Sequence, residues 1–182
     1  MESLYARLAE MHKNDGLDFS AAKSFNLDEY AGMAPEDVNS YRYYMNKHLF
    51  NNINIDMANT HLPVGNAPDL EAECQKYEDD ITACGGIDLQ LLGIGRSGHI
   101  GFNEPLSPFR SRTRAVGLTP TTYEQNSPLF DNPEDMPKRA LTMGVETVLD
   151  SRRIVMLVTG EEKADIIAQA IEGPMTSMIS AS

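Results

Sequence analysis

Apolar residues recur at the spacing of an amphipathic helix in several parts of this chain, with charged residues between them. Three such stretches predict helices over residues 2–13, 69–83 and 161–172. A fourth helix is predicted from Ser40, a residue type that caps helix starts, to about Phe50. In the last helix, the positions predicted to face inward are Ala164, Ile167, Ala168 and Ile171.

Short apolar runs between these helices predict strands at residues 21–26, 87–94, 114–118 and 154–158. The last run is continuously apolar, as expected for a strand inside a parallel sheet. Residues 119–135 are rich in turn-forming residues, and Pro137 predicts a helix from there through Val145. Because strands and helices alternate without a linker, the pattern predicts an α/β fold with a mainly parallel sheet, in a single domain of residues 1–182.

Composition and charge narrow the kinds of partner. The chain has a formal net charge of −12, which argues against nucleic acid because a phosphate backbone requires a basic surface. No apolar run approaches the roughly 20 residues of a membrane span, and no signal-peptide pattern is visible. Cys74 and Cys84 form neither a disulfide framework nor a zinc motif, so we expect reduced thiols and a cytoplasmic setting.

The stretch from Gly93 to Pro105 directly follows the predicted strand 87–94 and contains four glycines, His99 and Glu104. Ligand sites in open α/β sheets lie at the carboxyl ends of strands, so this loop is predicted to form the floor of an active site. A glutamate beside a histidine fixes the tautomer of the imidazole and stabilises its charged form, as an acid–base catalyst requires. From the residues alone, this catalytic role and that of a structural histidine in a tight loop are equally favoured.

Three other kinds of site fit the loop poorly. Gly93, Gly95 and Gly98 match a dinucleotide-binding pattern, but Gly101 and Pro105 interrupt the helix that such a pattern must open. The serine of the loop does not have the spacing of a hydrolase nucleophile, and the histidine and glutamate do not have the spacing of a zinc helix. Elsewhere, Asp28 and Glu29 follow a predicted strand, where the residues alone favour a surface turn over a catalytic pair.

Two segments resemble the signature stretches of the glucosamine-6-phosphate deaminase family. They are residues 25–30 (FNLDEY) and 93–105 (GIGRSGHIGFNEP), and the similarity extends from about Tyr5 to about Glu172. The related 6-phosphogluconolactonases share a Gly-x-Gly-x-x-Gly-His core but resemble the chain less. They typically have Asp-Glu-Arg at the first segment and lack the Phe-Asn-Glu-Pro continuation of the second.

The resemblance implies conversion of glucosamine 6-phosphate and water into fructose 6-phosphate and ammonia, in amino-sugar catabolism. It implies that His99, supported by Glu104, opens the pyranose ring and that Asp28 moves a proton from C2 to C1. Ser97 stands where the family has Asp or Asn beside the histidine, which implies slower ring opening. The resemblance also implies substrate contacts for Lys163, on the phosphate, and for Glu29 and Gly95. It implies neither a metal nor an organic cofactor.

The resemblance further implies a three-layer α/β/α sandwich with a Rossmann-like sheet that lacks its first strand and its final elements. The family's main phosphate loop would lie ahead of Met1, and Pro128 replaces a frequent arginine. We therefore expect an exposed sheet edge or groove, poor stability and little activity for this chain alone. The alternatives are a 6-phosphogluconolactonase-like hydrolase and a sugar-phosphate-binding protein with impaired catalysis. A homo-oligomer is left open.

Overall fold

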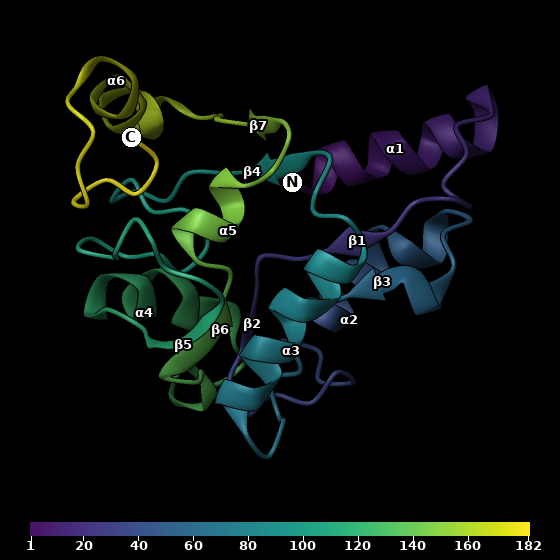
Figure 1. Cartoon of the computed structure of the whole chain (residues 1–182), viewed down its shortest axis with the longest axis horizontal. Coiled ribbons are helices and arrows are strands. Elements are labelled where there is room, and N and C mark those ends of the chain that lie inside the picture. The colour runs from purple at the N-terminus through teal and green to yellow at the C-terminus, as the bar shows by residue number, and fades with distance from the viewer.

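The computed structural model describes residues 1–182, and its helices and strands alternate along the chain (Figure 1). The helices are α1 (Glu2–Asp15), α2 (Tyr41–His48), α3 (Leu70–Ala83), α4 (Pro120–Asn126), α5 (Val145–Leu149) and α6 (Ala164–Glu172). The strands are β1 (Ser24–Phe25), β2 (Asp28–Tyr30), β3 (Thr60–His61), β4 (Gln90–Leu92), β5 (Arg114–Gly117), β6 (Arg139–Thr142) and β7 (Ile154–Met156). This order confirms the predicted α/β class.

The strands form three small sheets. Strand β1 pairs with β3, and β4 pairs with β7, both in parallel, as the sequence predicted for most of the sheet. Strands β2, β6 and β5 form an antiparallel sheet with β6 at its centre, which was not expected. Because β6 aligns Asp28 with its residue Thr142, this sheet places the predicted base beside the segment that follows β6.

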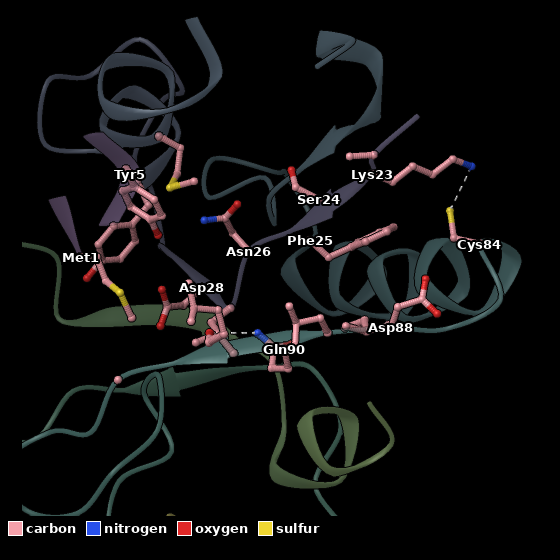
Figure 2. Close-up of a pocket in the computed structure, with 18 of the residues that line it drawn as sticks. Met1, Tyr5, Lys23, Ser24, Phe25, Asn26, Asp28, Cys84, Asp88 and Gln90 are labelled. Atoms are coloured by element: carbon pink, nitrogen blue, oxygen red, sulfur yellow. Dashed lines mark hydrogen bonds between the residues drawn. The ribbon is translucent and has the colours of Figure 1, made fainter. Parts of the chain in front are cut away.

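A groove of about 860 Å³ separates β1 from β4. Each of these strands has a partner on one side alone, so two unpaired edges face the groove. Both strands run along it in the same direction: Lys23 and Asp88 lie at one end, and Asp28 lies at the other (Figure 2). The side-chain oxygens of Ser24 and Gln90, which line it, are buried and accept no hydrogen bond. The expected groove is therefore present.

Helix α3 shows how local sequence sets an element and its packing. The Asp69 carboxylate accepts hydrogen bonds from the N–H groups of Glu71 and Ala72, which caps the first turn. The helix buries Tyr77 and Ile81, which pack with residues of β4 and of the loop that follows β4. A second cluster joins Tyr30 of β2 to Phe102 of that loop and to Met136 and Ala140, which lie before and within β6. The core therefore fixes the loop from two sides.

Four of the predicted elements differ from the structure. The helix predicted from Pro137 is wrong, because residues 139–142 form β6 between two partner strands. The turn-rich region contains α4, which Thr119 caps and Pro120 begins. Strand β7 has Ile154 and Val155 on the surface, at 40% and 42% exposure, because nothing pairs with its outer edge.

The fourth difference lies in α6, where the predicted inward face is wrong apart from Ile167, which is half-buried. Ala164 and Ala168 are exposed, and Ile171 is 75% exposed. The helix instead rests on the glycine loop, where a Cβ on Gly98 would lie 3.1 Å from Ile166 Cδ1. None of the helices combines the length and the apolar composition that a membrane span requires.

Candidate active site

The loop after β4 is held in shape by its glycines and by distant residues. Gly98 and Gly101 have φ angles of 77° and 57°, which side-chain-bearing residues rarely adopt. The buried Asn103 amide donates to the carbonyls of Ile100 and Met143, which ties the loop to the end of β6. The Ser180 hydroxyl accepts from the Ile100 N–H and donates to the Asn103 carbonyl. The loop is therefore braced by the C-terminal turn as well as by the sheet.

His99 lies at the centre of this loop with two partners at one ring nitrogen. Its Nδ1 is 2.7 Å from Ser97 Oγ and 3.5 Å from Glu104 Oε2. Burial lowers the pKa of His99; the Glu104 carboxylate opposes this, and the Lys163 ammonium adds to it. A carboxylate on the Nδ1 side favours a proton there, which leaves Nε2 as the acceptor nitrogen. The structure brings three of the four predicted catalytic residues together.

Gly95 supplies space for the imidazole ring. A Cβ at this position would lie 2.1 Å from His99 Nε2, closer than any nonbonded carbon contact allows. The Gly95 N–H also donates to the His99 carbonyl at 2.8 Å. The sequence-based interpretation gave Gly95 a contact with substrate, whereas the structure shows its contact with His99.

Asp28, the fourth predicted catalytic residue, begins β2 beside the same loop. A Cβ on Gly101 would lie 3.1 Å from Asp28 Oδ2, so the carboxylate is adjacent to the loop. No group donates a hydrogen bond to it, and it faces the end of the groove near Tyr5 and Met1 (Figure 2). Burial, with a smaller effect of the Glu29 charge, raises the pKa of Asp28 to about 7. An unpaired carboxylate of this pKa is suited to accept a proton near neutral pH.

Glu29 points away from Asp28 into the protein and does not reach the site. Its carboxylate accepts hydrogen bonds from the N–H groups of Tyr30, Tyr41 and Arg42, at 2.9–3.0 Å. These bonds, together with Arg42, oppose the rise in the pKa of Glu29 that burial causes. A buried carboxylate at the first turn of α2 satisfies N–H groups that lack helical partners. The predicted substrate contact of Glu29 is therefore replaced by attachment of α2 to β2.

Lys163 lies at the edge of the loop, on the turn that precedes α6. Its Nζ donates to the Ile94 carbonyl at 2.6 Å, and its charge lowers the pKa of His99. The ammonium group therefore reaches the loop from the C-terminal side of the chain, next to the imidazole.

Thr122 is a site residue that sequence reasoning missed. Its hydroxyl donates to Glu104 Oε1, on the side of that carboxylate away from His99. Thr122 is 2% exposed and belongs to α4, in the region predicted as turns. The pair Thr119-Pro120 is a cap followed by a favoured first helical residue, and this signal could have located the helix.

The loop thus carries an imidazole with a carboxylate beside it, next to a second carboxylate that receives no hydrogen bond, and these groups are suited to proton transfer. The family described as glucosamine-6-phosphate isomerases/6-phosphogluconolactonase matches residues 1–181, and the chain belongs to this family.

Two relatives show how close the similarity is within the family. The glucosamine-6-phosphate deaminase of Geobacillus sp. (strain WCH70) is 47% identical over 182 residues, which are 100% of this chain and 72% of that protein. The glucosamine-6-phosphate deaminase of Shewanella woodyi is 51% identical over 180 residues, covering 99% and 68% of the two chains.

Solved structures agree with this placement. A monomeric glucosamine-6-phosphate deaminase of the NagB superfamily superposes with a TM-score of 0.96 at 44% identity, over 99% of this chain and 75% of the other. A 6-phosphogluconolactonase from Thermotoga maritima superposes with a TM-score of 0.73 at 19% identity, over 99% and 73%, which shows the shared fold alone.

Proposed function

We propose that this chain is a glucosamine-6-phosphate deaminase, which converts glucosamine 6-phosphate and water into fructose 6-phosphate and ammonia in amino-sugar catabolism. The observation that carries the proposal is the presence of two separate proton-transfer groups beside one loop: the half-buried His99 and Asp28, which accepts no hydrogen bond. Relatives that carry this name, at 47% and 51% identity over almost the whole chain, support the same reaction.

The reaction begins with ring opening. The anomeric hydroxyl loses its proton as the ring oxygen gains one, and the C1 aldehyde forms. His99 is suited to both transfers, because burial lowers its pKa and leaves the imidazole neutral and able to accept a proton. Glu104 beside Nδ1 then stabilises the imidazolium that forms.

The second stage moves hydrogen between two carbons. Asp28 takes the proton from C2, electrons shift toward the C1 oxygen, and the protonated carboxyl group returns the proton to C1. The C1 oxygen takes up a proton that the ammonium group of the substrate releases, so the C1 carbonyl becomes an alcohol and C2 becomes an iminium. Water adds to C2 and ammonia leaves, which gives the ketone of fructose 6-phosphate. A carboxylate without hydrogen-bond donors, and with a pKa raised to about 7, is a strong enough base for this transfer and still releases the proton.

Substrate recognition in this proposal requires positive charge near the loop. The charge of the Lys163 ammonium lowers the pKa of His99, and its position supports a phosphate contact in which the substrate phosphate takes over from the Ile94 carbonyl as hydrogen-bond acceptor. Free thiols at Cys74 and Cys84 fit a reducing compartment, so the proposal includes a cytoplasmic location.

The test follows ammonia release from glucosamine 6-phosphate by the 182-residue protein, together with deuterium uptake from heavy water at C1 and C2. Asp28→Asn is expected to abolish deuterium exchange. His99→Gln is expected to slow the cyclic substrate while an open-chain analogue still exchanges. Asp131→Asn, an exposed carboxylate in the loop after α4, is the matched control and is expected to keep both activities.

Three results would contradict the proposal. Hydrolysis of 6-phosphogluconolactone without ammonia release would favour a lactonase. Thermal stabilisation by glucosamine 6-phosphate without turnover would favour a binding protein. Unchanged deuterium exchange in Asp28→Asn would show that another group is the base.

A further inference from the structure

The Glu104 carboxylate is held from both sides. Oε2 lies 3.5 Å from His99 Nδ1, while Oε1 accepts the hydrogen bond of the Thr122 hydroxyl. Both residues are buried: Glu104 is 8% exposed and Thr122 is 2% exposed. No other side chain donates to Glu104 at either oxygen. The direction in which this carboxylate faces the imidazole therefore depends on a single hydroxyl group.

The Thr122 hydroxyl is itself oriented by the first turn of α4. The Thr119 hydroxyl accepts from the Thr122 N–H and lies 3.3 Å from Thr122 Oγ1, to which it donates. An oxygen that accepts on one side directs its own proton to the other, and here the proton points to Glu104. The start of α4 thus continues a chain of polar contacts that runs through Glu104 and His99 to Ser97.

We propose that Thr122 is a positioning residue, which fixes the Glu104 carboxylate toward His99 and so makes α4 part of the acid–base machinery. The catalytic consequence of this role rests on the proposed deaminase reaction, whereas the positional role rests on the geometry alone. Thr122 touches neither the imidazole nor any reacting atom, and it acts through Glu104.

The role differs from simple packing in what it demands of the side chain. Valine has the shape of threonine without the hydroxyl, so Thr122→Val keeps the volume and removes the donor. Serine keeps the donor and loses a methyl group. If Thr122 only fills space, the valine variant is harmless and the serine variant is the damaging one. If it positions Glu104, the order is reversed.

The first measurement is an NMR titration of the His99 imidazole in the 182-residue protein, which requires no turnover. The signal is identified by its loss in His99→Gln. The groups that face this imidazole are Ser97, Glu104 and Lys163. None of them is substituted when Thr122 is changed. Without the Thr122 hydroxyl, the Glu104 carboxylate turns away from the ring, so Thr122→Val is expected to lower the pKa of His99 by about 0.5–1 unit. Thr122→Ser keeps the hydroxyl and is expected to restore the pKa of His99 to that of the unaltered protein.

A double-mutant comparison separates the direct effect from a general disturbance. In a Glu104→Gln background, Thr122→Val is expected to leave the His99 titration unchanged, because the charge that it positions is gone. Should Thr122→Val fail to fold, Thr122→Ala carries the same comparison. In the deaminase assay, kcat of Thr122→Val is expected to fall about tenfold with KM nearly constant, which is less than the about 100-fold or greater loss expected when an acid–base group itself is removed.

Two outcomes overturn the proposal: an imidazole titration in Thr122→Val that equals that of the unaltered protein, or failure of Thr122→Ser to restore it. Absence of ammonia release by the unaltered protein would reject the deaminase reaction instead. In that case the titration still decides the positional role of Thr122.

Discussion

Replacing Asp28 by asparagine tests whether the pKa of this carboxyl group is raised in the folded protein, through the pH dependence of the free energy of unfolding. Burial raises the pKa of Asp28 from 3.8 to about 7, so the folded chain holds this proton more tightly than the unfolded chain. Below both values the carboxyl group is protonated in either state. As the pH rises, the unfolded chain loses the proton first, and the free energy of unfolding decreases until the folded state has also ionised.

The magnitude follows from the size of the shift. A change of about 3 pKa units, at about 1.4 kcal/mol per unit, corresponds to about 4 kcal/mol. Asp28 faces an open groove, and water there screens the charge, so about 2–4 kcal/mol is expected. Asparagine does not titrate. The unfolding free energy of Asp28→Asn should therefore gain this amount over that of the unaltered protein between about pH 4 and about pH 8.

Urea unfolding at a series of pH values, followed by far-UV circular dichroism, measures this difference. The chain has 7 tyrosines and no tryptophan, so tyrosine fluorescence provides a second signal. Asp131→Asn, at an exposed position, is expected to track the unaltered protein at every pH. If the free energies of unfolding of Asp28→Asn and the unaltered protein differ by the same amount at about pH 4 and at about pH 8, the raised pKa of Asp28 is refuted.

Two further substitutions test how the site is built. Gly95→Ala would place a methyl group 2.1 Å from His99 Nε2, so the ring must leave its present position beside Ser97. Deaminase kcat is expected to fall at least about tenfold and the free energy of unfolding by about 1–3 kcal/mol; an unchanged kcat in enzyme assays would contradict this. Glu29→Gln turns an amide donor toward N–H groups that need acceptors, so the free energy of unfolding measured in urea is expected to fall by about 1–3 kcal/mol. The control Glu36→Gln, at an exposed position, is expected to change it little.

Elements whose signals are local could be predicted from the sequence. Helix α3 has its cap, its apolar stripe and its terminating glycines within the same 18 residues, and the structure agrees with the prediction. Strand β6 has no such local signal. Residues 139–142 become a strand because β2 and β5, far away in the sequence, pair with both of its edges. Tertiary pairing therefore overrode the helix start that Pro137 indicated.

The site residues divide in the same way. His99, Ser97 and Glu104 lie in one short segment, so their meeting was visible in the sequence, and the structure places them together. Thr122 joins them from 18 residues further along, through a helix that the proline-rich region concealed. Glu29 and its acceptor role depend on the start of α2, 12 and 13 residues away. Adjacent carboxylates such as Asp28 and Glu29 necessarily diverge along a strand, which an alternation argument could have anticipated.

The groove between β1 and β4 also bears on how this chain behaves in solution. Two unpaired, parallel strand edges facing each other are a template for any extended polypeptide segment, and in a purified sample the available segments belong to other copies of the chain. Self-association through such edges grows with protein concentration. A copy that supplies a segment to another copy is left without that segment itself, so the process can continue from copy to copy. Dilution, more than cooling, should therefore keep this chain dispersed, and light scattering across a concentration series at fixed temperature would reveal the dependence.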